Sequence, residues 1–240
     1  MYTRRTFFGT AAAFTSAAAV TTVLSTGSAS AQDPCAVFTP DRQKAKTPAE
    51  AIKRLMDGND RFVAGKSITC DLMAQVKATS TGQSPFAAIV GCIDSRAPPE
   101  MLFDLNLGDV FAARIAGNFV NVDILGSLEF ACKVAGAKAI VVLGHSECGA
   151  IKGAIDQAKL GNLTAMLTKF EPAIAASKIT GERTSKDKAL VQTVADHHSR
   201  LTAKMILDGS PVLKEMFDKG EITIVAAMHD ISTGKVSILT

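Results

Sequence analysis

The chain has 240 residues, of which 47% are hydrophobic and 20% charged, so it is long enough for one generous domain and has an ordinary globular composition. Its net charge is +3, and the residues other than Arg4 and Arg5 carry 24 basic and 23 acidic side chains. Domains that bind nucleic acid are strongly basic, so this balance argues against a nucleic-acid partner.

Residues 1–31 are predicted to be a twin-arginine signal peptide. The pair Arg4-Arg5 precedes an apolar stretch rich in Ala, Thr and Ser, and Ala29-Ser30-Ala31 offers a cleavage site of small residues. A membrane anchor is the alternative, but residues 9–24 are few and contain many hydroxyl side chains. We therefore expect an exported, periplasmic protein in which residues 32–240 form a single domain with no membrane segment.

Residues 32–80 are predicted to form an N-terminal arm followed by helices. Residues 32–47 are polar and interrupted by prolines, which is typical of an arm. The sequence Thr47-Pro48-Ala49-Glu50 is typical of a helix start, with a threonine cap, a proline in the first turn and a capping-box glutamate. Apolar residues at helical spacing continue this helix towards Gly65, and a second helix is expected over residues 71–79.

After Pro85, short apolar runs alternate with helical patterns. The expected strands are residues 86–91, 110–114, 138–143, 222–228 and 235–239. The expected helices between them are residues 121–135, 148–159, 163–177 and 185–207. This alternation predicts an α/β fold with a mainly parallel sheet covered on both faces. A tight turn at residues 229–234 makes the last strand an antiparallel edge strand.

Metal-ligating side chains follow two of the buried strands. Cys92 follows the first strand, His145 follows the third, and Cys148 begins the next helix. Sites in open α/β sheets form at the carboxyl ends of strands, so these three donors meet if the first and third strands are neighbours. Two thiolates and an imidazole favour Zn²⁺, and three protein ligands leave a fourth position open, as in catalytic zinc sites.

An acid and an arginine lie beside the first of these donors. Arg96 is expected to pair with Asp94 and to keep its carboxylate ionised. Such a carboxylate either accepts a hydrogen bond from zinc-bound water, and so orients the hydroxide, or binds zinc as a fourth ligand and closes the site. A purely structural ion pair is the alternative.

The other cysteines and histidines are interpreted more simply. Cys132 lies in an apolar helical stretch and is expected to be a small buried hydrophobe. An oxidising compartment would permit a disulfide between Cys35 and Cys70, but the sequence does not give their separation in space. Solvated or structural roles, rather than proton transfer, are expected for His197, His198 and His229.

Three spaced motifs closely resemble β-class carbonic anhydrases. They are Gly91-Cys-Ile-Asp-Ser-Arg-Ala-Pro-Pro-Glu100, Leu107-Gly-Asp-Val-Phe-Ala-Ala-Arg-Ile-Ala-Gly-Asn118 and Val142-Leu-Gly-His-Ser-Glu-Cys-Gly149. The resemblance runs from about Ala49 to the C-terminus. It implies one zinc ion per subunit held by Cys92, His145 and Cys148. It further implies Asp94 and Arg96 as the catalytic pair in the reversible hydration of CO₂ to bicarbonate.

The resemblance also implies an architecture and an assembly. The sheet order would be 2-1-3-4-5, and the chain would form a homodimer or a dimer of dimers in which N-terminal helices pack over the neighbour. The chain departs from the family in two ways. Asn106 lies near the place of a glutamine that helps to position substrate in some members, and there is no tryptophan for an inhibitory bicarbonate pocket. We therefore expect the always-open type, with Asp94 paired to Arg96.

The sequence leaves two other functions open. The same scaffold would serve a hydrolase of CS₂ or COS, because such members differ in the shape of an access channel that the sequence does not show. A zinc-binding or redox-sensing protein without turnover is the second alternative. The Asp94–Arg96 pair argues against it, because a structural zinc site prefers four protein ligands and has no use for an oriented acid.

Overall fold

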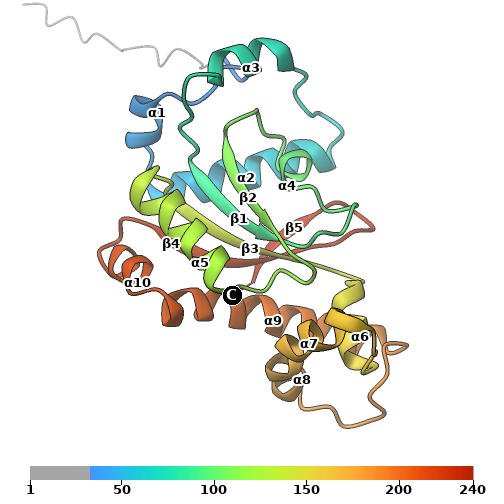
Figure 1. The fold of residues 1–240 in the computed structure, drawn as a ribbon. Coiled ribbons are helices and arrows are strands. Elements are labelled where there is room, and N and C mark those ends of the chain that lie inside the picture. The colour runs from blue at the N-terminus through green and yellow to red at the C-terminus, as the bar shows by residue number, and fades with distance from the viewer. Residues whose placement is uncertain (1–32, 240) are drawn as a thin grey trace, which may run out of the picture. The chain divides into compact units, whose positions relative to one another are not determined.

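A five-stranded sheet forms the centre of the structure (Figure 1). The computed structural model describes residues 33–239, so the predicted signal peptide lies outside the described residues. The strands are β1 (Ala87–Gly91), β2 (Val110–Arg114), β3 (Ala139–His145), β4 (Thr223–His229) and β5 (Val236–Leu239). Their order is β2-β1-β3-β4-β5, and β5 alone among them runs antiparallel to its neighbour. The predicted fold class, strand order and antiparallel edge are confirmed.

Helices cover this sheet and extend beyond its edges. Those before β1 are α1 (Pro40–Lys44), α2 (Pro48–Val63) and α3 (Leu72–Thr79). Those between β1 and β4 are α4 (Pro99–Leu102), α5 (Val122–Glu129), the π-helix η1 (Phe130–Val134), α6 (Gly149–Ile155), α7 (Gly161–Leu167), the 3₁₀-helix η2 (Thr168–Phe170), α8 (Glu171–Ala176), α9 (Lys188–Gly209) and α10 (Pro211–Asp218). No helix among the described residues is both long enough and apolar enough to cross a membrane.

The N-terminal helices begin where the capping residues predict. Thr47 accepts a hydrogen bond from the Glu50 backbone at 3.2 Å, and the Glu50 carboxylate accepts one from the Thr47 backbone at 2.8 Å, which completes the capping box of α2. Asp71 caps α3 by accepting a hydrogen bond from the Ala74 backbone N–H at 3.0 Å. The polar segment before α2 also contains the short helix α1, which periodicity did not predict because it has only five residues.

The two faces of the sheet carry separate apolar layers. On one face, Leu55 of α2 packs with Ile89 and Val141. On the other face, Val90 and Val142 pack with residues of η1, α9 and α10, including Ile206 and Leu213. Neighbouring residues of β1 and β3 therefore point into different layers, and both are buried. The sequences of β1 and β3 are continuous apolar runs because both faces of these strands are buried.

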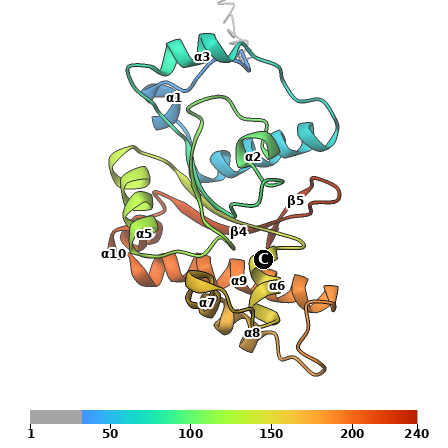
Figure 2. The same cartoon turned by 45° about the vertical axis from the view of Figure 1, so that its right-hand side comes forward.

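The connections differ from the predicted ones in several places. The helix expected over residues 163–177 is divided into α7, η2 and α8, because Pro172 lies in the first turn of a new helix. Ser210 caps α10, which follows α9 directly and was not predicted. The helix expected over residues 121–135 ends as the π-helix η1. Helices α6, α7 and α8 gather at one end of α9 (Figure 2), next to the point where β3 leads into α6.

Candidate metal centre

Three metal-binding side chains meet at the carboxyl ends of β1 and β3. These strands pair in parallel, with Gly91 opposite Leu143. Cys92 is the first residue after β1, His145 is the last residue of β3, and Cys148 is the N-cap of α6. Their ligand atoms all lie within 4.8 Å of one another, and each residue is at most 5% exposed. The convergence expected from the strand order is therefore present.

The orientation of His145 suits a metal ligand. Its Nδ1 lies 2.9 Å from the carbonyl oxygen of Ser146, which only accepts hydrogen bonds, so Nδ1 carries the proton. The other ring nitrogen, Nε2, is buried and has no hydrogen-bond partner among the described residues. Histidine ligands usually donate their second nitrogen to a carbonyl or carboxylate in this way, which leaves the lone pair of Nε2 for the metal.

The two thiols share one negative charge. A hydrogen bond from the Cys148 thiol lowers the pKa of Cys92 to about 4, and the backbone N–H of Gly117 adds a second bond to the Cys92 sulfur at 3.2 Å. The pKa of Cys148 is raised, by the hydrogen bond to Cys92 and by burial. A thiolate beside an imidazole attracts a soft cation, and the cation then displaces the protons that remain on the second thiol and on the metal-facing ring nitrogen. The donor set therefore fits zinc.

Asp94 and Arg96 form a two-point ion pair at the rim of this cluster. Arg96 donates from Nε to Oδ1 at 2.9 Å and from Nη2 to Oδ2 at 2.8 Å. These bonds hold the pKa of the Asp94 carboxyl well below its usual range. The same Oδ2 lies 3.9 Å from His145 Nε2, and the Arg96 side chain is 54% exposed. An ionised carboxylate thus stands between the buried donors and solvent.

Arg114 is a site residue that the sequence interpretation missed. It ends β2, and it donates from Nε to the Cys92 carbonyl at 2.8 Å and from Nη2 to the Asp94 carbonyl at 2.7 Å. Both bonds fix the backbone that carries the first thiol and the carboxylate. Arg114 could have been predicted from its position at the carboxyl end of a strand beside β1, because this strand ends at the same edge of the sheet as the donors.

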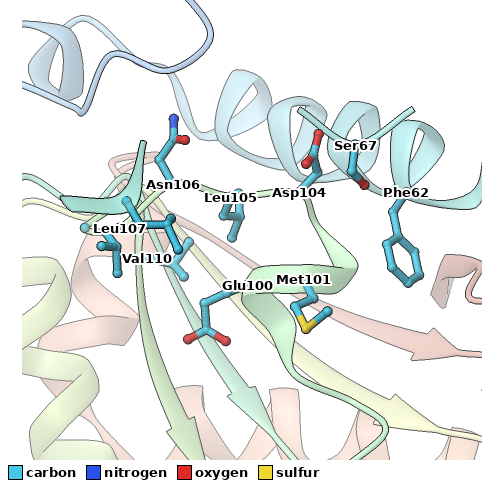
Figure 3. Close-up of a pocket in the computed structure, with 11 residues that line it drawn as sticks. Phe62, Ser67, Glu100, Met101, Asp104, Leu105, Asn106, Leu107 and Val110 are labelled. Atoms are coloured by element: carbon cyan, nitrogen blue, oxygen red, sulfur yellow. The ribbon is translucent and has the colours of Figure 1, made fainter. Parts of the chain in front are cut away.

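Asn106 lies apart from the three donors. Its side-chain amide donates to the Pro34 carbonyl at 2.8 Å and accepts from Gln75 at 2.7 Å. It lines a hollow of about 540 Å³ beside α4 whose lining includes none of the donors, and its amide points away from Glu100 (Figure 3). In this chain Asn106 therefore fastens the N-terminal arm to the loop before β2.

The remaining cysteines and histidines lie outside the donor cluster. Cys35 and Cys70 form a disulfide with a Cα–Cα distance of 5.5 Å, which settles the alternative that the sequence left open. Cys132 is a free buried thiol, as expected. Of the histidines interpreted as solvated or structural, His198 and His229 are buried, which removes the solvated alternative for both.

A family model described as carbonic anhydrase matches residues 87–236, which is more than half of the chain. The chain belongs to the carbonic anhydrase family. Carbonic anhydrase 2 of Mycobacterium tuberculosis is 34% identical over 193 residues, which cover 78% of this chain and 91% of that protein. The family match includes all five residues of the donor cluster and its ion pair.

Solved carbonic anhydrases of the β class share the fold. A β-carbonic anhydrase of Aspergillus fumigatus is 25% identical with a TM-score of 0.61, and the match covers 68% of this chain and 79% of that one. A β-carbonic anhydrase of Sordaria macrospora is 23% identical with a TM-score of 0.60, and covers 79% and 97%. The β class predicted from three motifs is therefore confirmed, and a Cys–His–Cys donor set is typical of its zinc site.

Proposed function

We propose that this β-carbonic anhydrase hydrates CO₂ reversibly to bicarbonate and a proton at a zinc ion held by Cys92, His145 and Cys148. The observation that carries the proposal is the buried cluster of two sulfurs and one unpartnered imidazole nitrogen within 4.8 Å. Three protein donors leave one coordination position free, which distinguishes catalytic from structural zinc sites. The family match supports the reaction.

Each polar residue around the cluster has a distinct task in this reaction. When bound, zinc supplies a Lewis acid that lowers the pKa of water, so that hydroxide is available at neutral pH. Asp94 accepts hydrogen bonds but cannot donate one while it is ionised, so it fixes the O–H direction of the nucleophile and leaves a lone pair for the carbon of CO₂. Arg96 keeps Asp94 ionised and in place, and Arg114 holds the backbone of both.

The geometry supports the open form of the site. Both carboxylate oxygens of Asp94 are occupied by Arg96, so Asp94 would have to leave two charge-assisted hydrogen bonds before it could serve as a fourth zinc ligand. A closed form with Asp94 on the metal therefore requires a competitor for Arg96. We propose that the open form is the resting state near neutral pH.

Two alternatives use the same cluster. A hydrolase of CS₂ or COS would keep the zinc and the ion pair and would differ in substrate preference. A zinc-binding or redox-sensing protein would keep the zinc without turnover. The second alternative is disfavoured because the Asp94–Arg96 pair reaches solvent beside the donors, where an entering molecule would meet it.

Stopped-flow CO₂ hydration on metal-quantified protein tests the proposal. We expect one zinc per chain and rapid turnover in the wild type, and loss of both in Cys148→Ser. The matched control is Cys132→Ser, which makes the same change at another buried cysteine outside the cluster and is expected to keep zinc. Turnover of COS or CS₂ without CO₂ hydration would support the first alternative, and bound zinc without any turnover the second.

We also propose that the chain assembles as a homodimer or a dimer of dimers. The Sordaria macrospora enzymes are described as tetrameric. In this chain, Val122, Phe130 and Val134 of α5 and η1 are each more than half exposed, which is typical of a surface covered by a partner. Light scattering coupled to gel filtration measures the assembly, and a monomer at micromolar concentration would contradict it.

Export to the periplasm by the twin-arginine signal is a further part of the proposal. The disulfide between Cys35 and Cys70 supports it, because such bridges persist in oxidising compartments. Export of a folded protein also suits a metal site that is loaded inside the cell. Replacing Arg4 and Arg5 with lysine should leave the protein in the cytoplasmic fraction, and unchanged export would contradict this route.

A further inference from the structure

The loop after β2 makes a direct contact with the proposed metal centre. Gly117 donates its backbone N–H to the Cys92 sulfur at 3.2 Å. Its φ of +79° is a conformation that side-chain-bearing residues rarely adopt. A Cβ at this position would also lie 2.4 Å from the Phe170 ring. The N–H···S contact therefore depends on a glycine held in one specific position.

The carbonyl group of Gly117 is bound by a histidine of α9. His198 Nε2 lies 2.8 Å from the Gly117 carbonyl oxygen, and this oxygen can only accept, so Nε2 carries the proton. The His198 ring also packs on Phe170, with 4.6 Å between ring centroids. Gly117 is therefore bordered by the Phe170 ring, where a Cβ would lie, and is hydrogen-bonded through its carbonyl oxygen to His198.

His198 is a neutral hydrogen-bond donor in this position. It is 3% exposed, and burial lowers its pKa to about 4. Thr202, one turn further along α9, places its hydroxyl 3.5 Å from the same Nε2. His198 is therefore held in the tautomer that carries its proton on Nε2. This N–H points at the Gly117 loop and not at solvent.

We propose that His198 is a positioning residue for the metal centre, which fixes Gly117 so that the Gly117 N–H stays bonded to the Cys92 sulfur. The inference rests on the proposed zinc site and adds a residue to it from a helix that carries none of the ligands. An N–H···S bond withdraws charge from a thiolate and fixes its direction. Partners behind the ligands typically change metal affinity by about 10–100-fold when they are removed.

Cobalt substitution gives a readout of the Cys92 sulfur that does not depend on activity. The sulfur-to-cobalt charge-transfer band in the near ultraviolet reports how strongly the thiolate donates to the metal. In His198→Ala the N–H···S bond is expected to weaken, so the band should move to lower energy. Competition with a chromophoric chelator should show weaker cobalt and zinc affinities, by up to about 10-fold, because the Gly117 N–H remains but is less well positioned.

Two further variants separate positioning from general stabilisation. His198→Gln retains a neutral N–H donor at a similar reach, and it should restore the band position and most of the metal affinity. His197→Ala removes the neighbouring histidine of the same helix, and it should leave both readouts at wild-type values. Thermal melting of all three variants shows how much each change destabilises the fold.

The outcomes distinguish this inference from the proposed zinc site. If wild-type protein binds no cobalt or zinc in a sulfur-rich site, the proposed function fails and the inference fails with it. If the wild type binds metal normally and His198→Ala has the same band and affinity, the inference alone is overturned. A lower melting temperature in His198→Ala with an unchanged band would likewise overturn it, because this would indicate only a structural role.

Discussion

Asp94 has the most clearly defined chemistry of the residues around the donors, because both its oxygens are bonded to Arg96. We predict that Asp94→Asn keeps stoichiometric zinc but lowers kcat/KM for CO₂ hydration by about 10–100-fold. The asparagine amide can donate a hydrogen bond, so it no longer forces the nucleophile to direct its proton towards position 94. Stopped-flow hydration and metal analysis of the same sample measure both quantities.

The result for Asp94→Asn is informative in either direction. Full activity would contradict the orienting role and leave the ion pair as a structural feature. Loss of zinc would instead place Asp94 among the ligands, as in the closed form. Arg96→Gln is the companion variant: it removes the charge that keeps the pKa of Asp94 low, so its activity should fall as pH decreases through a range in which wild-type Asp94 stays ionised.

His198 gives a prediction for stability against pH. Its pKa is lowered from 6.5 to about 4 in the folded protein. Between these values the unfolded chain binds more protons than the folded one, so the free energy of unfolding decreases as pH falls from 6.5 towards 4. Because of His198, the free energy of unfolding above pH 6.5 should exceed that below pH 4 by about 3 kcal/mol.

Urea unfolding of the wild type and His198→Gln across this pH range measures that contribution. Glutamine does not titrate, so the difference between the two free energies of unfolding should shrink as pH falls from 6.5 to 4. Carboxylates with lowered pKa, such as Asp94 and Asp156, lose their contribution below this range and are common to both proteins. A difference that is independent of pH would contradict the buried neutral state of His198.

At the scale of elements, the disulfide joins the segment before α1 to the segment before α3. It closes a loop with a sequence separation of 35 residues. We predict that the double variant Cys35→Ser/Cys70→Ser lowers the free energy of unfolding by about 2–4 kcal/mol, because the unfolded chain loses a constraint. The zinc content should not change, since neither cysteine belongs to the donor cluster.

Chemical denaturation with and without reductant measures this effect. Reductant should destabilise the wild type and leave the double variant unchanged. Mass analysis of alkylated, unreduced protein should show Cys92, Cys132 and Cys148 as the free thiols of the metal-free chain. Five alkylated cysteines without prior reduction would contradict the bridge.

The elements that sequence predicted best are those with a strong local signal. Strands β1 and β3 are continuous apolar runs, and α2 has a complete capping box. The short helices α1 and α4 were missed because their 5 and 4 residues make too few turns to show a period. Helix α10 was missed although it has 8 residues, as many as the predicted α3, and although Ser210 and Pro211 mark its start. The division of residues 163–177 into three helical segments follows from Pro172 in the first turn of α8, a signal that the sequence contains but that the expected single helix ignored.

The same distinction applies to the metal centre. Cys92, His145 and Cys148 were predictable because strand ends at one edge of a parallel sheet lie close together whatever the details of packing. His198 was not predictable as part of the site, because it lies on a helix that carries no ligand and contacts Gly117, which is 81 positions away in the sequence. Burial of His198 and His229 also depends on tertiary packing that a polar-looking helix or a strand end does not reveal.

At the scale of the whole molecule, the proposed zinc ion links the end of β1, the end of β3 and the start of α6. A ligand that binds only the folded chain raises the free energy of unfolding by about 2.7 kcal/mol at a concentration 100 times its Kd. Removing zinc should therefore lower Tm by about 5–10 °C. Differential scanning calorimetry before and after treatment with a chelator measures the shift. Added zinc should restore Tm in the wild type, and Cys148→Ser should respond to neither treatment.

The proposed function depends on two thiolates and one imidazole that bind a single zinc ion and leave one coordination position to solvent. X-ray absorption at the zinc edge of the purified protein tests it most directly. We predict two sulfur atoms at about 2.3 Å and two nitrogen or oxygen atoms at about 2.0 Å from each zinc ion. A site with four protein sulfur or histidine ligands, a single sulfur, or no stoichiometric zinc would contradict this open zinc site.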